Sequence, residues 1–320
     1  MTVGTSAGAS AVPTIPGIDE ALQARVVDAM GAVAARLSEV VDHEDPFIAE
    51  ASGHLAAAGG KRFRPLLTVL ASEVGDGWNE QVVDAAVGVE LTHLASLYHD
   101  DVMDEADLRR GVTSANARYG NSTAILVGDL LFGTASSVVA GLGAEAAVLA
   151  GDADDDGAVA AYLQILADKT GALIATAARY GAMFGGCDPA TVRALTAFGE
   201  KLGVVFQLAD DLLDVSSDTS GKPAGADLRE GKATLPVLYA RTSTDPADAR
   251  LVELTRRPVD GADELEEALG LLRAHPAMDE ARRHTRRLAD EARALLDEVG
   301  GGPAVEALRS LVDGVAERSV

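Results

Sequence analysis

Two acidic clusters, each following an apolar helical run, constrain this sequence more than any other feature. The first spans Asp100 to Asp104 (DDVMD) and the second spans Asp210 to Asp214 (DDLLD). In each cluster the first and last aspartates are i and i+4, so a helix places them on one face about one turn apart. Like charges at this spacing weaken a helix by roughly 0.2–0.5 kcal/mol. A solvated helix face would explain either cluster alone, but two such clusters after apolar runs point to a ligand.

The ligand that these clusters favour is a divalent metal. Carboxylates beside apolar surface are costly to desolvate unless they are paired or bind a cation. Hard oxygen ligands select Mg2+ rather than zinc, and Mg2+ is held by a few carboxylates together with substrate phosphates. The sequence therefore predicts a site where several magnesium ions bind a diphosphate.

Composition favours an all-α chain with no nucleic-acid partner. Aromatic residues make up 4% of the 320 residues, and alanine and leucine are abundant, which favours helices over strands. The net charge of −23 repels nucleic acid and anionic lipid. It also repels a diphosphate, so local cations must accompany the metal. The single Cys187 forms no internal disulfide, as expected in a reducing compartment.

The chain reads as one domain after a short tail. Residues 1–17 lack the basic start and apolar centre of a signal peptide and predict a flexible tail. Residues 18–320 show helical periodicity, no strand pattern and no linker, so we expect a single all-helical domain. The most apolar run, Leu130 to Ala144, is shorter than the ~20 residues that a membrane span needs. We expect it to be a buried core helix and expect no stable membrane insertion.

Basic residues occur where a diphosphate needs them. A Gly-Gly stop precedes Lys61, Arg62 and Arg64, and Pro65 suits the first turn of a new helix, so this stretch favours an anion site. Arg109 and Arg110 follow the first acidic cluster, and guanidinium groups suit diphosphate oxygens. The polar segment Ser216 to Asp227, with Lys222, is interpreted as a lid. A basic turn or an ordinary linker would explain either stretch alone.

Together these motifs give a specific resemblance. Over about residues 55–240, the chain resembles the trans-polyprenyl diphosphate synthase family, and the matching motifs follow one another in the family's order. The matching stretches are Gly59–Pro65 (GGKRFRP), Asp100–Gly111 with its RRG, Lys169–Gly171 (KTG), Phe206–Asp214, and Gly221–Leu228 followed by Gly231–Pro236. The resemblance implies one large helical bundle of the isoprenoid synthase type around a central apolar cavity. It also implies condensation of isopentenyl diphosphate with an allylic diphosphate in trans geometry.

The resemblance implies a role for each matching residue. For isopentenyl diphosphate the expected ligands are Lys61, Arg64, His93 and Arg110; for the allylic diphosphate they are Arg109, Lys169, Thr170, Gln207, Lys222 and Lys232. Magnesium, with three ions expected per site, is held by Asp100, Asp104 and Asp210, with Asp101, Asp211 and Asp214 as ligands or close support. The family also implies a homodimer.

Product length depends on the residues before the first acidic cluster, where the family uses large side chains to block the tail pocket. Here Gly88, Thr92, Ala95 and Ser96 are small and would line about 12 Å of wall along a helix. We expect a deep tunnel and a product of about thirty to fifty carbons, as in quinone side chains. Tyr98 stands where the family usually has an aliphatic residue and would narrow the entrance.

Several other functions stay open at this point. A shorter-chain synthase making farnesyl or geranylgeranyl diphosphate would share all the motifs. A class I terpene cyclase shares the fold and one aspartate motif, but would not need Lys61 and Arg64. A non-catalytic partner subunit should have lost aspartates, and both clusters are intact. A purely structural helical protein explains none of the motifs. We expect the protein to act in the cytoplasm.

Overall fold

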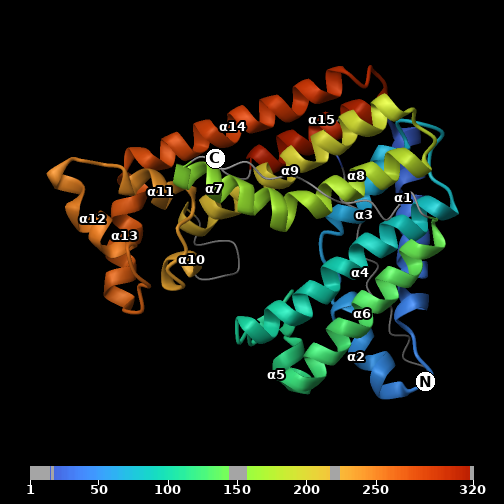
Figure 1. The fold of residues 1–320 in the computed structure, drawn as a ribbon, viewed down its shortest axis with the longest axis horizontal. Helices are drawn as coiled ribbons and strands as arrows, with labels where there is room; N and C mark the ends of the chain where they lie inside the picture. The colour runs from blue at the N-terminus through green and yellow to red at the C-terminus, as the bar shows by residue number, and fades with distance from the viewer. Residues whose placement is uncertain (1–14, 16–17, 144–156, 217–223, 318–320) are drawn as a thin grey trace, which may run out of the picture. The chain divides into compact units, whose positions relative to one another are not determined.

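The computed structural model describes residue 15 and residues 18–143, 157–216 and 224–317, and these fall into two compact units (Figure 1). Unit 1 comprises residues 1–150, 176–193 and 301–308, and unit 2 comprises residues 151–175, 194–300 and 309–320. Each unit is described by itself below. The single domain over residues 18–320 stays a prediction, and the tail at residues 1–17 lies almost wholly outside the described residues.

Unit 1 is built from helices and one short hairpin. Its elements are α1 Glu20–Val41, α2 Pro46–Ala57, α3 Phe63–Ser72, α4 Glu80–Met103, β1 Leu108–Arg109, β2 Val112–Thr113, α5 Ala115–Tyr119 and α6 Asn121–Gly141. These helices agree with the helical periodicity of residues 18–320. The two-residue strands, which pair antiparallel, are a small departure from the expectation of no strands.

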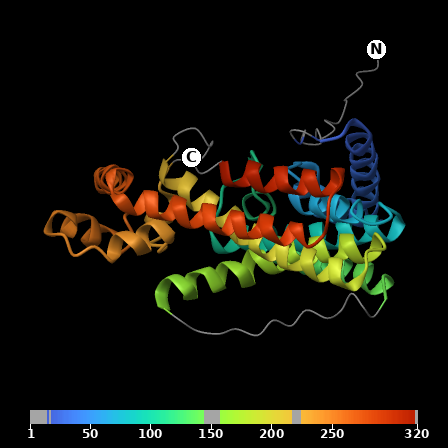
Figure 2. The ribbon, with the colours of Figure 1, turned by 90° about the horizontal axis from the view of Figure 1, so that it is seen from above.

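Unit 2 is wholly helical in its described residues. It contains α7 Gly157–Leu166, a π-helical turn Ala167–Gly171, α10 Ala226–Arg229, α11 Leu235–Arg241, a 3-10 turn Pro246–Asp248, α12 Ala249–Thr255, α13 Ala262–Ala274 and α14 Pro276–Asp297. Figure 2 shows α14 along its length. Three helices, α8 Ala172–Phe184, α9 Pro189–Ser216 and α15 Pro303–Ala316, contribute residues to both units. Asp188 accepts hydrogen bonds from the Ala190 and Thr191 amides and so caps the start of α9.

The core of unit 1 lies where α4 packs against α1, α2 and α6. Leu91, Leu94 and Tyr98 of α4 are fully buried. The Tyr98 hydroxyl donates to the Ala51 carbonyl and accepts from the Leu55 amide, both on α2. Tyr98 therefore joins α4 to α2, and burial raises the pKa of its hydroxyl above the usual value.

Helix α6 is only half a core helix. Its Val127, Leu131 and Ala135 are buried against α4, but Leu126 is 67% exposed and Ile125 and Leu130 are also exposed. The prediction of a buried core helix over Leu130 to Ala144 is therefore wrong for the outer face of α6, because its neighbours within unit 1, α1, α2, α4 and α5, leave that face exposed. By length and composition α6 is apolar enough to cross a membrane.

Candidate active site

The RRG stretch after the first acidic cluster forms the turn of a hairpin. Leu108 pairs with Thr113, and Arg109 pairs with Val112, so Arg110 and Gly111 are the two loop residues. Their φ angles are 53° and 78°, as a type I′ turn requires. Glycine meets this requirement without strain, whereas Arg110 adopts a left-handed conformation that is uncommon for a side-chain-bearing residue.

The Gly-Gly-Lys-Arg stretch forms the loop between α2 and α3, and it lies against the same turn. A Cβ built on Gly60 would lie 3.0 Å from the Arg110 guanidinium carbon, so glycine allows the two loops to approach. Arg110 donates to the Leu55 carbonyl at 3.2 Å and to the Gly59 carbonyl. The structure thus brings together two basic motifs that lie about fifty residues apart in sequence.

A cluster of cations surrounds the middle of α4. Arg62 Nη1 lies 2.6 Å from Glu90 Oε1, and Arg110 Nη2 lies 3.7 Å from the same oxygen. Arg64 is largely buried, and burial lowers the pKa of its guanidinium. Its Nε atom has no hydrogen-bond partner in the part of the chain that the structure describes. A buried N–H of this kind lacks an acceptor, which a bound anion would supply.

His93 faces this cationic cluster and is uncharged. Burial lowers its pKa to about 2, with further lowering by the charges of Arg64, Arg110, Arg62 and Arg109. Lys61, by contrast, is exposed. Of the four residues predicted to bind isopentenyl diphosphate, Arg64, His93 and Arg110 therefore lie in one electrostatic environment on unit 1, with Lys61 at the rim of the same loop.

The first acidic cluster divides into outer and inner carboxylates. Asp101 is fully buried; it accepts from Arg109 Nε at 2.5 Å and from the Ala115 amide at 3.0 Å. Asp104 follows the last residue of α4, is 52% exposed, and lies 3.5 Å from Arg109 Nη2. Asp100, on the last turn of α4, is half-buried. The geometry makes Asp101 a support that holds Arg109 and the start of α5, and leaves Asp100 and Asp104 as the outer carboxylates.

The small residues of the predicted tunnel wall lie on α4, and the wall meets α6 at Gly88. A Cβ built on Gly88 would come within 2.7 Å of Val139 Cγ2, so a side chain of α6 occupies that space. Thr92 donates to the Gly88 carbonyl, Ser96 donates to the His93 carbonyl, and Ala95 is fully buried. A tunnel along this face stays a prediction.

The second acidic cluster belongs to unit 2 and also has an inner carboxylate. Asp211 is 3% exposed; it accepts from the Tyr162 hydroxyl and from Gln207 Nε2 at 3.2 Å. Burial raises the pKa of Asp211 to about 7, although both hydrogen bonds act in the opposite direction. Asp210 is half-buried on the same turn of α9.

Asp214 serves as an anchor for the start of α10. Its Oδ1 and Oδ2 each lie 3.1 Å from a backbone amide, those of Ala226 and Asp227. Its own carbonyl accepts from the Gly225 amide at 2.9 Å. With both carboxylate oxygens engaged, Asp214 fits the support role that the sequence allowed for it better than the role of a metal ligand.

The remaining predicted ligands of the allylic diphosphate lie in unit 2. Lys169 and Thr170 lie in the π-helical turn Ala167–Gly171, between α7 and α8; such turns are frequent at functional sites. A Cβ on Gly203 of α9 would lie 2.6 Å from Gly171 Cα, so two glycines let this turn approach α9. Lys232 is 58% exposed and pairs with Glu230 and, at 3.7 Å, with Asp227. Lys222 lies outside the described residues.

The carboxylates fit Mg2+ by chemistry, although neither unit gathers a full ligand set alone. Among the described residues, no group of three histidine, cysteine, aspartate or glutamate side chains converges as a metal site. Asp100 and Asp104 belong to unit 1, and Asp210 belongs to unit 2. The hard oxygen atoms of Asp100 and Asp104, one turn apart at the end of α4, suit a cation that also binds phosphate.

Three residues of the site carry contacts that the sequence did not assign. Glu90 pairs with two arginines, Tyr162 donates to Asp211, and Asp227 is held by Asp214 and faces Lys232. Glu90 stands three residues before His93, so helical spacing would have placed both on one face. Tyr162 left no signal, because it lies 49 residues from its partner within an apolar helix.

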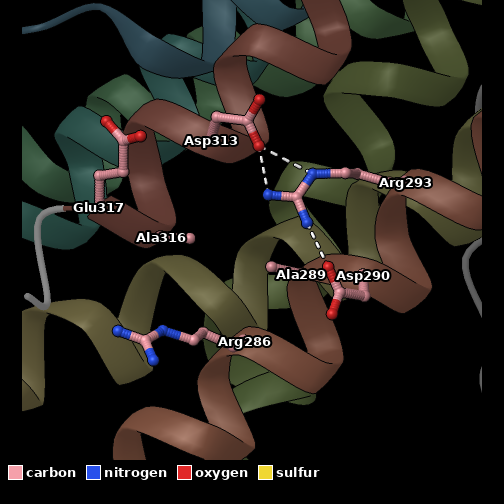
Figure 3. A pocket seen from close by; sticks show the side chains of 7 residues that line it. All are labelled: Arg286, Ala289, Asp290, Arg293, Asp313, Ala316 and Glu317. Carbon is pink, nitrogen blue, oxygen red and sulfur yellow. Dashed lines mark hydrogen bonds and ion pairs between the residues drawn. The ribbon is translucent and has the colours of Figure 1, made fainter.

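A pocket of about 220 Å³ lies elsewhere in unit 2, between α14 and α15 (Figure 3). Arg293 crosses it, donating to Asp313 at 2.8 Å and pairing with Asp290. None of the predicted site residues lines this pocket. Because salt bridges of Arg293 span this pocket, we interpret the pocket as a gap in the packing of two amphipathic helices.

The comparisons with known proteins agree with this picture. A Polyprenyl synthetase family model matches residues 45–272. Nonaprenyl diphosphate synthase of Mycobacterium tuberculosis is 43% identical, over 91% of this chain and 93% of the relative. A structure of geranylgeranyl pyrophosphate synthase from Corynebacterium glutamicum, complexed with calcium and isoprenyl diphosphate, is 39% identical with a TM-score of 0.82, covering 94% of this chain and 98% of that chain.

A third similar protein is decaprenyl diphosphate synthase from Rhodobacter capsulatus, whose structure is 31% identical with a TM-score of 0.81, covering 94% of this chain and 99% of that chain. These likenesses confirm the predicted all-α bundle. Since the family match covers most of the chain and the relatives are matched over nearly their whole length, the chain belongs to the polyprenyl synthetase family.

Proposed function

We propose that this protein is a magnesium-dependent trans-prenyltransferase that condenses isopentenyl diphosphate with an allylic diphosphate. The observation that carries the proposal is the cluster of Arg62, Arg64 and Arg110 around the single carboxylate of Glu90. In a chain with a net charge of −23, this local excess of half-buried positive charge favours binding of an anion. A diphosphate supplies the charge and the acceptor oxygens that guanidinium groups favour.

Two sets of residues would bind the two substrates. Lys61, Arg64, His93 and Arg110 hold isopentenyl diphosphate, while Arg109, Lys169, Thr170, Gln207, Lys222 and Lys232 serve the allylic diphosphate. His93 is uncharged, so it offers a hydrogen bond rather than charge to the diphosphate. In the condensation, the carbon–oxygen bond of the allylic diphosphate breaks and the diphosphate leaves. A carbon–carbon bond forms to isopentenyl diphosphate, which loses a proton.

Asp100, Asp104 and Asp210 would hold Mg2+, three ions per site, with Asp101, Asp211 and Asp214 in support. When bound, Mg2+ stabilises the negative charge that develops on the departing diphosphate. Arg109 is held by Asp101 at 2.5 Å, so this guanidinium is oriented before substrate arrives and contributes to the same charge stabilisation. The apolar helices exclude water from the reacting carbons.

The product we propose is long, about thirty to fifty carbons, for a quinone side chain. Support comes from the small residues of α4 and from similarity to nonaprenyl and decaprenyl diphosphate synthases. The test is product chromatography after incubation with farnesyl and isopentenyl diphosphates. Ala95→Phe should shorten the product, because Ala95 is fully buried on the proposed wall. Geranylgeranyl diphosphate as the sole product of the unaltered enzyme would defeat the long-chain proposal.

A shorter-chain synthase is the second candidate, and the contact of Val139 with Gly88 favours it. If Val139 ends the tunnel, Val139→Ala should lengthen the product while Val138→Ala should not, since Val138 lies 4.0 Å from the same point and Val139 lies at 2.7 Å. Turnover of radiolabelled isopentenyl diphosphate with and without Mg2+ tests the activity itself. No turnover in either condition would favour a non-catalytic partner, and turnover of the allylic substrate alone would favour a cyclase.

We also propose that the protein is a cytoplasmic homodimer with the outer face of α6 as the interface. Ile125, Leu126 and Leu130 leave an apolar strip exposed in unit 1, which suits a second copy of the same strip. Light scattering after gel filtration should give twice the chain mass, and Leu126→Glu should give a monomer. Sedimentation with vesicles, with no dimer in solution, would assign the strip to a membrane instead.

A further inference from the structure

Glu90 is a carboxylate buried in the middle of α4. It is 1% exposed, with Val89 and Leu91 of the same helix also buried. A buried charge is costly unless it is paired and hydrogen-bonded. Because Glu90 is buried among apolar residues, it needs partners that compensate its charge. It is neither one of the metal ligands nor one of the substrate ligands proposed above.

Glu90 holds two arginines through one oxygen. Arg62 Nη1 lies 2.6 Å from Glu90 Oε1, and Arg110 Nη2 lies 3.7 Å from it. The opposite edge of each guanidinium binds carbonyls at the end of α2: Arg62 Nη2 donates to Ala56 at 2.5 Å, and Arg110 Nη1 donates to Leu55 at 3.2 Å. These carbonyls belong to the last turn of a helix, where carbonyl oxygens are free of intrahelical bonds and can accept hydrogen bonds from cationic side chains.

Both arginines have an unfavourable backbone conformation. Arg62 has φ 45° and Arg110 has φ 53°, a left-handed region that costs a residue with a side chain of order 1 kcal/mol or more. Such strain persists only where surrounding contacts over-determine it. Glu90 is the contact that these two strained residues share, although they lie in different loops.

The charge balance leaves the cluster ready for an anion. Arg62, Arg64 and Arg110 carry three positive charges, Glu90 carries one negative charge, and His93 is neutral because its pKa is lowered to about 2. Glu90 offsets part of the repulsion among the arginines, so they can stay close together in the absence of substrate. The remaining positive charge, with the unpartnered Arg64 Nε, is left for a diphosphate.

We propose that Glu90 is a positioning residue of the isopentenyl diphosphate site: it fixes the guanidinium of Arg110 and, through Arg62, the loop from Gly59 to Arg64. This inference rests on the assignment of Arg64 and Arg110 to isopentenyl diphosphate in the proposed function. Glu90 itself does not touch the substrate. Its effect is specific to one of the two substrates, since its two partners lie in that substrate's site.

The test is Glu90→Gln, which keeps the shape of the side chain and removes its charge. We expect the KM for isopentenyl diphosphate to rise about tenfold or more, with the KM for the allylic diphosphate within twofold and kcat within threefold. Glu90→Asp keeps the charge on a shorter side chain and should give a smaller rise in the same KM. A uniform loss of kcat, or an equal rise in both KM values, would overturn the proposal.

Glu73→Gln is the matched control. Glu73 follows α3 in the same unit, its side chain is 3% exposed, and it pairs with Arg25 Nε at 2.6 Å. We expect this variant to lose melting temperature as Glu90→Gln does, with both KM values unchanged. A change in the KM for isopentenyl diphosphate here would show that removing the charge of any buried glutamate with an arginine partner produces the effect.

Arg110→Ala separates this inference from the proposed function. If Arg110→Ala leaves the KM for isopentenyl diphosphate unchanged, the assignment of the site is wrong. If it raises that KM while Glu90→Gln does not, the assignment stands and the positioning role is wrong. Should Glu90→Gln fail to fold, Arg62→Lys takes its place, because loss of the Arg62 fork should raise the same KM selectively.

Discussion

The two acidic clusters repeat one spacing but use it in different chemical surroundings. In unit 1 the inner carboxylate, Asp101, is neutralised by the charged Arg109 at 2.5 Å. In unit 2 the inner carboxylate, Asp211, accepts hydrogen bonds from the neutral donors Tyr162 and Gln207 among the described residues, and its pKa rises to about 7. A cation compensates burial of a carboxylate more fully than a hydroxyl or an amide does.

The last aspartates of the clusters differ as well. Asp104 is 52% exposed after the final residue of α4, whereas Asp214 holds the amides of Ala226 and Asp227. The same five-residue pattern thus gives two outer carboxylates in unit 1, Asp100 and Asp104, and one in unit 2, Asp210. The difference suggests that the first cluster contributes more ligands to the metals than the second.

The largest expected effect is the loss of an outer carboxylate. Asp100→Ala should lower kcat by about a thousandfold or more, because the metal that stabilises the leaving group loses a ligand. The melting temperature of the metal-free protein should stay within a few degrees. Steady-state turnover at saturating Mg2+ measures the first effect and thermal unfolding in EDTA measures the second. Activity near that of the unaltered enzyme would remove Asp100 from the site.

The inner carboxylate of unit 1 should matter chiefly for stability. Asp101→Asn leaves Arg109, whose side chain is 19% exposed, without its counter-charge, and breaking a buried pair costs about 3 kcal/mol. Urea unfolding measures this loss. Asp104→Asn is the control, since its 3.5 Å contact with the same arginine is exposed and is worth within about 1 kcal/mol. Equal losses in the two variants would contradict the division into inner and outer carboxylates.

Sequence reasoning predicted the helical character and the motifs well, because both depend on local patterns. Apolar periodicity predicted helices throughout residues 18–320, as the structure has them in its described residues. It did not predict the π-helical turn at Ala167–Gly171, which lies where Gly171 packs closely on Gly203. It also placed α6 in the core, since an apolar run does not reveal which of its faces is covered.

The sequence predicted which residue types make up the site. It did not predict which carboxylates are inner and which are outer. Spacing alone treats the aspartates of a cluster alike, yet burial separates Asp101 and Asp211 from their neighbours. That burial depends on residues distant in sequence, such as Tyr162, 49 positions before its partner. Glu90 was visible as an acidic residue on α4, but its two arginines come from loops whose approach no local pattern encodes.

The next effect concerns acid sensitivity in unit 1. His93 stays neutral in the folded chain because its pKa is lowered to about 2, while the unfolded chain takes up a proton near pH 6.5. Stability therefore falls as the pH drops below about 6.5, by up to roughly 2 kcal/mol at pH 5. His93→Gln should lose less stability over this range in urea unfolding. A pH profile of His93→Gln identical to that of the unaltered chain would contradict the assignment.

The smallest effect should come from the inner carboxylate of unit 2, and its pH dependence should have the opposite sign. A carboxyl whose folded pKa is about 7 and whose ordinary value is 3.8 binds its proton more tightly when folded. Its contribution is present in full below about pH 4 and is lost as the pH rises through 7. Asp211→Asn should therefore change stability by about 1 kcal/mol or less near pH 4, where the folded carboxyl is protonated, and it should flatten the fall between pH 4 and 7 in EDTA. Tyr162→Phe removes a hydrogen bond that lowers this pKa, so it should extend the fall to higher pH. If Asp211→Asn instead costs as much as Asp101→Asn at pH 5, Asp211 is charged in the folded protein at that pH, and the contrast between the two clusters is wrong.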